Sequence, residues 1–290
     1  MPALATSASA RLLAALPRLT PRDHRLLDLL ADHTVLSTSQ IAAITFGSMS
    51  AARTRLTTLH RLGMLSRHAR GLASGGRSEY LYSLGPAGAL LRPHASTGLD
   101  GRHERVPARH TDRVALIAAS PHLGDALARS QFFADLTASA RTSPDTRLTR
   151  WWSHRRTAEV FGRFGIRDAS YGVWQRGART TGFFLYLDPG RQPISKVLSP
   201  LAGHRWLAEV GPRHPVLIQT TTAARAKTLL DVIGRYRWAG VEVAVIVAGE
   251  HPAERVWRLA SERSGPYALH ELPSHPQDGA EDLTIPYPDR

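Results

Sequence analysis

The chain has 290 residues, a formal net charge of +13 at pH 7 and a sequence pI of about 11.1. It contains no cysteine, which excludes disulfides, zinc sites with thiolate ligands and a cysteine nucleophile. No apolar run approaches the ~20 residues that a membrane-spanning helix needs. We therefore expect a cytoplasmic protein without a membrane partner, and the basic excess favours a polyanion as its ligand.

The first third of the chain carries over half of this charge. Residues 1–92 hold 11 arginines against 4 acidic residues, a net of +7. We interpret residues 1–18 as a flexible tail, with a short docking helix through Leu12, Leu13 and Leu16 as the alternative. Thr20 before Pro21 predicts the start of a first helix, with the threonine as cap and the proline at the first helical position. Ser37 caps a second predicted helix, which ends at Gly47.

A third helix is predicted from about Ser50, with Ser48 or Ser50 as its cap, because Ala52, Leu56, Leu59 and Gly63 recur at helical spacing on one face. Gly63 is the expected left-handed cap. A β-hairpin should follow, with strands at 64–68 and 78–84, and Tyr80, Tyr82 and Leu84 should pack on the helices. Three short helices and a hairpin predict a winged helix-turn-helix over residues 19–92, whose third helix reads DNA.

The outward face of the third helix combines hydroxyl groups with guanidinium groups. Threonine, serine and arginine reach base edges in the major groove, which a helix fits. Hairpin arginines suit phosphates or the minor groove. The structural alternative is a solvated helix face beside an ordinary hairpin. The candidate DNA contacts are Ser50, Arg53, Thr54, Arg55, Thr57, Thr58, Arg61, Arg67, Arg70 and Arg77.

Residues 93–145 are interpreted as a linker followed by a helical pair. The linker contains His94, His103 and His110, which lack metal-ligand spacing, so a solvated loop is the preferred interpretation. The helices at 112–119 and 121–141 are expected to offer a homodimer interface.

Residues 146–262 are predicted to form an α/β domain. Its order of helix, hairpin, helix, strand, helix, strand indicates a mixed sheet covered on both faces. Residues 263–290 should form a flexible tail. The complete fold class is therefore α+β: a winged helix, then an α/β domain resembling a degenerate restriction-endonuclease-like core.

That core suggests one catalytic alternative, a metal-dependent nickase or nuclease. Such a site needs clustered oxygen ligands for Mg²⁺ beside a phosphate. Asp168 and Asp188 are the candidates, but Tyr186 stands where a second acid is expected and no lysine follows. We expect no cofactor or metal unless this alternative holds; otherwise the two aspartates are turn and strand-end residues.

Three aromatic residues invite functional hypotheses of their own. Tyr236 is a candidate nucleophile of the relaxase type, but the paired His-x-His motif is missing, so a helix-face aromatic is preferred. Trp151 and Trp152 are candidates for stacking on bases, although we prefer buried anchors at a domain interface.

Several stretches together resemble the replication-relaxation family of plasmids and mobile elements in high-GC bacteria. They are L-T-P-R-D-H-R-L-L-D-L-L, R-L-T-T-L-H-R-L-G-M-L and Y-L-Y-S-L-G-P-A-G in the first 90 residues, then F-F-L-Y-L-D-P-G and V-L-I-Q-T-T-T-A-A-R. The resemblance implies a nucleoid- or plasmid-associated DNA-binding protein of plasmid replication or copy control. Double-stranded DNA is the expected partner, and a replication or transfer protein is a further one. A transcriptional regulator and a protein-docking module remain alternatives.

Overall fold

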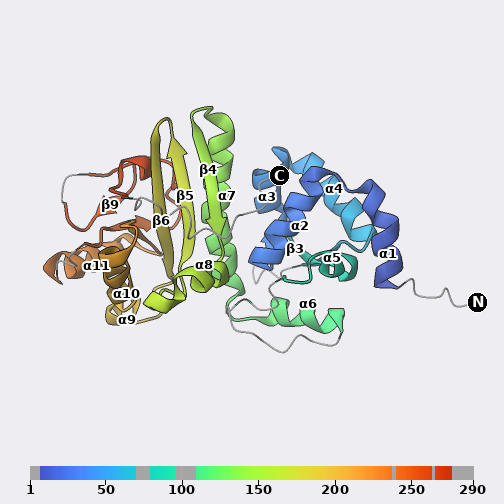
Figure 1. The fold of residues 1–290 in the computed structure, drawn as a ribbon, viewed down its shortest axis with the longest axis horizontal. Helices are drawn as coiled ribbons and strands as arrows, with labels where there is room; N and C mark the ends of the chain where they lie inside the picture. The colour runs from blue at the N-terminus through green and yellow to red at the C-terminus, as the bar shows by residue number, and fades with distance from the viewer. Residues whose placement is uncertain are drawn as a thin grey trace, which may run out of the picture. The chain divides into compact units, whose positions relative to one another are not determined.

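A computed structural model describes residues 7–69, 79–95, 99, 109–236, 240–262 and 265–275. It divides into two compact units, residues 1–134 and 135–290, and each is described by itself. The fold is α+β, as the sequence predicts (Figure 1). The boundary falls inside helix α7 (Leu123–Thr142). The segment expected at 93–145 as a linker with a helical pair is therefore shared between the two units.

The first unit is built from short helices and a three-stranded antiparallel sheet of order β1-β3-β2. Its elements are α1 (Ala8–Ala15), η1 (Leu16–Arg18), α2 (Pro21–His33), β1 (Leu36–Ser37), α3 (Thr38–Ile41), η2 (Ala42–Phe46), α4 (Met49–Arg61), β2 (Leu65–Ala69), β3 (Tyr80–Leu84), α5 (Pro86–Leu91) and α6 (His110–Ala119).

Helix starts in this unit follow the capping residues of the sequence. Thr20 and Ser37 each form a complete capping box, with Asp23 and Gln40 as the returning side chains. Both predicted starts are confirmed. After α3 the chain widens into a single π-helical turn, η2, and Gly47 leaves it with a φ of 73°. The second predicted helix is thus an α-helical turn joined to a π-helical one.

The N-terminal segment departs from the expected flexible tail. Residues 8–18 form α1 and η1, and Ala15 is completely buried. Helix α1 packs against α5. The tail prediction missed this helix because its apolar face is only a few leucines and alanines long.

Helices α6 and α7 extend the core of the first unit. Leu99, Ile117 and Leu123 pack with Val35 and Leu81 in one apolar cluster. The expected loop histidines have separate outcomes. His110 begins α6 and its Nε2 lies 2.7 Å from the Ser66 hydroxyl, whereas His103 lies outside the described residues.

The second unit contains a mixed six-stranded sheet of order β4-β5-β6-β7-β8-β9. The pairs β6–β7 and β7–β8 are parallel and the other pairs are antiparallel, which confirms the predicted mixed sheet. Besides the second half of α7, its elements are β4 (Thr146–Trp152), α8 (His154–Phe161), η3 (Gly162–Phe164), β5 (Ser170–Arg176), β6 (Arg179–Asp188), α9 (Ile194–Leu198), α10 (Leu201–Val210), β7 (Val216–Thr220), α11 (Ala223–Tyr236), β8 (Val243–Val247), β9 (Arg258–Leu259) and η4 (Leu269–Glu271).

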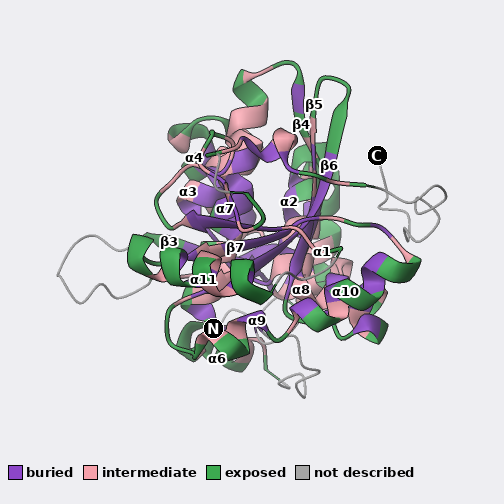
Figure 2. Ribbon diagram, turned by 90° about the vertical axis from the view of Figure 1, so that its left-hand side faces the viewer, coloured by how far each residue is buried: buried purple, intermediate pink, exposed green. Residues whose placement is uncertain are grey.

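One face of this sheet packs against α8, α10 and α11. Phe184 and Ile218 of the central strands meet Phe161, Leu207 and Leu229 of these three helices in a single core. Strands β6 and β7 are almost wholly buried, while α10 and α11 expose residues along their outer sides (Figure 2). The parallel strands β6, β7 and β8 therefore place their carboxyl ends at one edge of a covered sheet.

The C-terminal segment is ordered further than expected. Residues 265–275, predicted as tail, include the buried Leu269 and Leu272, and η4 packs on β5 and β6. His275 exchanges two backbone hydrogen bonds with Arg213. The remainder of the predicted tail, residues 276–290, lies outside the described residues.

Candidate nucleic-acid interface

Helix α4 is held by a narrow apolar stripe. Ser48 caps its first turn by accepting a hydrogen bond from the Ala51 N–H at 3.3 Å. Ala52, Leu56 and Leu59 are completely buried. At the other end Gly63 takes a φ of 74°, in the left-handed region that glycine tolerates best. Both ends and the buried stripe lie where the sequence predicts them.

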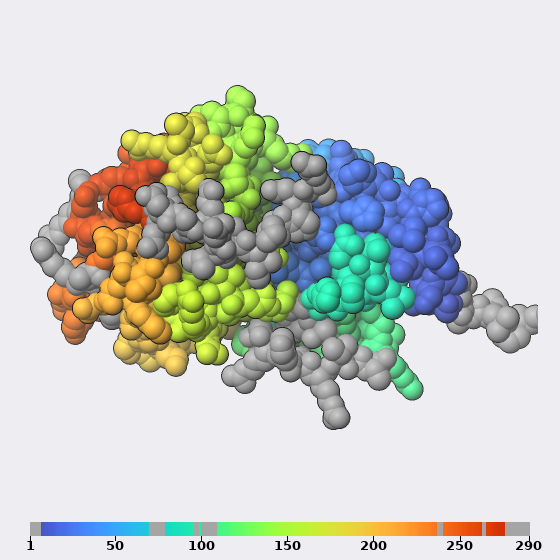
Figure 3. Space-filling model, viewed as in Figure 1, coloured from blue at the N-terminus to red at the C-terminus, as the bar shows by residue number. Residues whose placement is uncertain are grey.

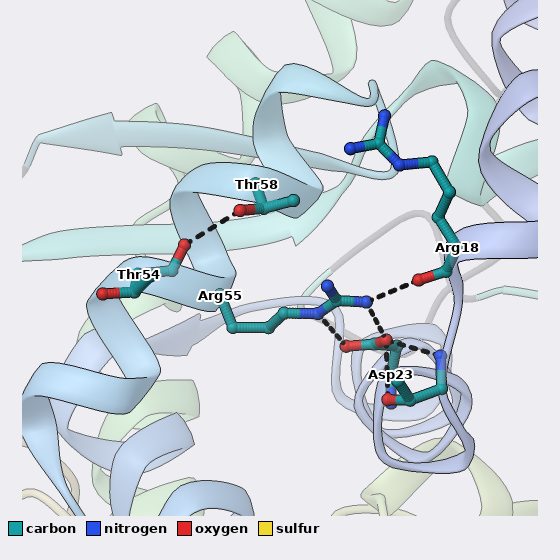
Figure 4. Close-up of polar contacts among 6 residues, drawn as sticks. Arg18, Asp23, Thr54, Arg55 and Thr58 are labelled. Carbon is teal, nitrogen blue, oxygen red and sulfur yellow. Dashed lines mark hydrogen bonds and ion pairs between the residues drawn. The ribbon is translucent and has the colours of Figure 1, made fainter.

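A buried ion pair fixes α4 to α2. The Nε of Arg55 donates to Oδ1 of Asp23 at 2.9 Å, its Nη2 bonds Oδ2, and the same Nη2 donates to the Arg18 carbonyl at 2.8 Å (Figure 4). Asp23 is completely buried and also accepts the Thr20 N–H and hydroxyl, each at 2.7 Å. The Arg55 guanidinium is therefore committed to the protein's own scaffold.

The protonation of Asp23 reflects these contacts. Burial raises its pKa, but the hydrogen bonds from Arg55 and Thr20 outweigh burial and leave the pKa below its usual value. Asp23 is thus a carboxylate at neutral pH and forms a charge-assisted pair with Arg55. No sequence pattern indicates this partnership, because the two residues are 32 positions apart.

The opposite side of α4 is polar and open. Ser50, Arg53, Thr54 and Arg61 are exposed, while Thr57 and Thr58 are half-buried. Within the described residues, neither Arg53 nor Arg61 has an ion-pair partner. The Thr57 hydroxyl donates to the Arg53 carbonyl at 2.9 Å, and that of Thr58 to the Thr54 carbonyl at 3.2 Å. The hydroxyl protons of these two threonines are therefore donated within the helix. A ligand can meet only their methyl groups and the lone pairs of their oxygens.

The hairpin adds a further cation beside this helix. Strands β2 and β3 pair from Leu65↔Leu84 to Ala69↔Tyr80. Arg67 is exposed and its guanidinium lies 4.7 Å from the centroid of the Tyr80 ring. Tyr80 is 44 % exposed, so the expectation that it packs on the helices is wrong, whereas Tyr82 and Leu84 are buried. Arg70 and Arg77 lie outside the described residues.

The second unit tests the other candidate residues. Asp188 ends β6 with its side chain buried, and both carboxylate oxygens accept hydrogen bonds. Oδ2 accepts from Arg225 Nε at 2.7 Å and from the Thr220 hydroxyl at 3.2 Å. Oδ1 accepts from the Gly190 N–H at 3.0 Å and from Arg225 Nη2 at 3.2 Å. A cation that used this carboxylate would have to displace the guanidinium.

Tyr186 lies in the apolar core of the second unit. Its hydroxyl lies 2.9 Å from Nε2 of His204, and both side chains are buried. Burial lowers the pKa of His204 to about 3, so the imidazole is neutral. Asp168 is exposed, two residues before β5. Among the described residues, no group of three or more histidines and acids is placed to hold a metal ion.

Comparison with known proteins identifies the chain. The model of the replication-relaxation family matches residues 27–217, about two thirds of the sequence. The chain belongs to the replication-relaxation family. The resemblance found in the sequence is confirmed, and membership suggests a role in plasmid or mobile-element replication. No curated protein and no solved structure shows significant similarity to the chain.

The family match begins within α2 and ends within β7. It therefore includes α4, the hairpin and the first strands of the larger sheet of this replication-relaxation protein. In the described part of the chain, none of the helices has the length and apolar character of a membrane span.

The remaining aromatic candidates have clear positions. Trp151 and Trp152 are 7 % and 2 % exposed, which agrees with the interpretation as buried anchors over that of stacking platforms. Tyr236 is 73 % exposed at the last turn of α11. The exposed Trp206 of α10 was missed, because one tryptophan between buried leucines gives no sequence signal that separates it from core.

Proposed function

We propose that this replication-relaxation family protein binds double-stranded DNA, with the first unit acting as a winged helix in plasmid or mobile-element replication or copy control. The observation that carries the proposal is the exposed side of α4, where Arg53 and Arg61 have no acidic partner in the described structure. A helix with short polar side chains on one side and leucine on the other suits the major groove.

The contacts divide by chemistry. Ser50, Thr54 and Arg61 have exposed side chains suited to base edges, and the methyl groups of Thr57 and Thr58 suit thymine. Arg53 and Arg67 suit phosphates, and Arg70 and Arg77 enter the proposal from the sequence alone. Arg55 takes a different role from the one expected, because it positions α4 through Asp23 and leaves phosphate contacts to its neighbours.

The arrangement needs no cofactor, and it implies strong dependence on salt. If the four arginines assigned to phosphates make these contacts, log K should fall against log salt with a slope of about −3.6. A slope near zero for duplex binding contradicts the electrostatic part of the proposal.

The test is a selection of duplexes from a random pool with the full chain, followed by affinity measurements on the winning sequence and on a scrambled one. Arg61→Ala should lower the preference for the selected site by about 1–3 kcal/mol, whereas Arg53→Ala should weaken both duplexes alike. Arg191→Ala, an exposed arginine outside the first unit, is the matched control. Equal behaviour of the Arg61 and Arg191 variants overturns the assignment of α4.

A further inference from the structure

Trp206 differs from the other tryptophans of the described structure. Trp151, Trp152, Trp174 and Trp257 are at most 7 % exposed, whereas Trp206 is 51 % exposed. Tryptophan is highly buried on average, and an exposed indole offers a large apolar face for contact with a ligand. The surface around Trp206 is therefore a candidate binding site in the second unit.

The ring is mounted on a rigid base. Segment η3 and helix α10 pack together at the surface of the second unit (Figure 3). The Trp206 ring meets the buried Phe164 ring edge to face, with centroids 5.0 Å apart and an interplanar angle of 76°. Gly203 permits this approach, because a Cβ there would lie 2.3 Å from the Phe164 carbonyl oxygen. A ring held this way loses little conformational entropy when a ligand stacks on it.

Arginines accompany the ring on the segments that carry it. The Arg163 guanidinium lies 4.7 Å from the Phe164 centroid, on the ring that supports Trp206. Arg163, Arg167 and Arg205 are exposed and have no ion-pair partner within the described residues. The exposed acids on the same segments are Asp168 and Glu209. Three exposed guanidinium groups against two exposed carboxylates give the two segments that carry these rings a net positive charge.

The apolar part of the surface is small. Val210, one turn after Trp206, is 56 % exposed and completes it. A stable protein–protein interface buries about 1,200–2,000 Å² in total, far more than these two side chains supply. One aromatic face flanked by arginines is instead the arrangement that binds unpaired bases, with stacking for the base and cations for the phosphates.

We propose that Trp206 and the flanking Arg163, Arg167 and Arg205 bind single-stranded DNA by stacking an unpaired base on the indole. This site goes beyond the duplex contact of α4, since it lies in the other unit and takes a different form of the nucleic acid. Its ligand is selected by base unpairing rather than by sequence, because every base offers a face for stacking.

The test measures binding of a fluorescent oligothymidylate to the full chain. Trp206→Ala should weaken this binding about tenfold or more, and Trp206→Phe should recover most of the loss because it keeps an aromatic face. Replacing Arg163 and Arg205 by glutamine should weaken binding and reduce its salt slope by up to about 2. Tyr236→Ala removes an aromatic that is 73 % exposed on α11 and is the matched control.

Three outcomes overturn the proposal. The first is unchanged oligothymidylate affinity in Trp206→Ala, and the second is a phenylalanine variant as weak as the alanine one. The third is loss of self-association in Trp206→Ala without loss of DNA binding, which assigns the surface to protein contacts. The affinity of Trp206→Ala and of Arg61→Ala for the selected duplex is measured in parallel. This comparison separates failure of the Trp206 site from failure of the proposed duplex contact of α4. Thermal unfolding of each variant verifies that it is folded.

Discussion

Each of the two units contains a buried aspartate paired with an arginine, and the pair has a different consequence in each. In each, a buried aspartate binds an arginine of a neighbouring helix through both oxygens: Asp23 with Arg55, and Asp188 with Arg225. In the first unit the pair orients a helix whose other side stays open. In the second unit the pair occupies Asp188, the carboxylate that the nuclease alternative requires to be free. An acid or a cation at an expected functional position is therefore informative only when its partner is known.

The largest expected effect comes from breaking the more enclosed pair. Asp188→Ala leaves Arg225, the Thr220 hydroxyl and the Gly190 N–H without their shared buried acceptor. We therefore expect a loss of about 3 kcal/mol in the free energy of unfolding, measured in urea. Asp145→Ala removes an exposed pair with Arg176, whose atoms are 3.6 Å apart, and is expected to change the same quantity by about 0.5 kcal/mol or less. Similar losses in both variants would show that the buried pair has no special role.

A second experiment separates scaffold from contact on one helix. Arg55→Ala leaves Asp23 charged and buried, and should lower the free energy of unfolding by about 2–3 kcal/mol. Arg53→Ala, two residues earlier and exposed, should leave that free energy unchanged while weakening duplex binding about tenfold. Unfolding and binding are measured on the same preparations. If Arg53→Ala destabilises the protein as much as Arg55→Ala, the division of roles on α4 is wrong.

The buried histidines predict a dependence on pH. Burial lowers the pKa of His204 to about 3, and burial with the nearby His275 lowers that of His214 to about 4. Below about pH 6.5 these imidazoles bind protons in the unfolded chain but stay neutral in the folded one. The free energy of unfolding therefore falls as the pH drops from 6.5 toward 4. Each histidine should contribute about 1 kcal/mol per pH unit there.

The control for this pH dependence is His204→Gln, in which one titrating group is absent. Its stability should fall less steeply over the same window in urea titrations at pH 7, 6 and 5. An unchanged slope in this variant would show that the pKa of His204 is the same in the folded and the unfolded chain. A second variant, Tyr186→Phe, removes the hydrogen bond to His204 but keeps the imidazole. The slope of stability against pH should be nearly unchanged in this variant.

The smallest expected effect is in a cleavage assay. Since Arg225 occupies Asp188, supercoiled plasmid incubated with the protein and Mg²⁺ or Mn²⁺ should not relax. Asp168→Ala should behave like the unaltered chain. Relaxation that depends on Asp168 would revive the nuclease alternative.

Local sequence signals located helix starts and ends correctly in the first unit. The caps at Thr20, Ser37 and Ser48 and the left-handed Gly63 are short-range features, and each lies where the sequence indicates. Partnerships across the chain were missed for a physical reason. The Arg55–Asp23 and Arg225–Asp188 pairs join residues 32 and 37 positions apart, and no periodicity encodes which distant charge a side chain meets. The exposure of Trp206 was missed likewise, because the spacing of α10 does not reveal which side its neighbours cover.

The base of the hairpin limits how this protein can vary. A Cβ on Gly85 would lie 2.3 Å from the Gly63 carbonyl oxygen, and one on Gly88 would lie 2.2 Å from that of Met64. Backbone meets backbone there, so even a single added methyl group has no room. Variant libraries that aim to change DNA specificity should therefore keep Gly85 and Gly88. They should diversify positions 50, 53, 54 and 61, whose side chains are exposed.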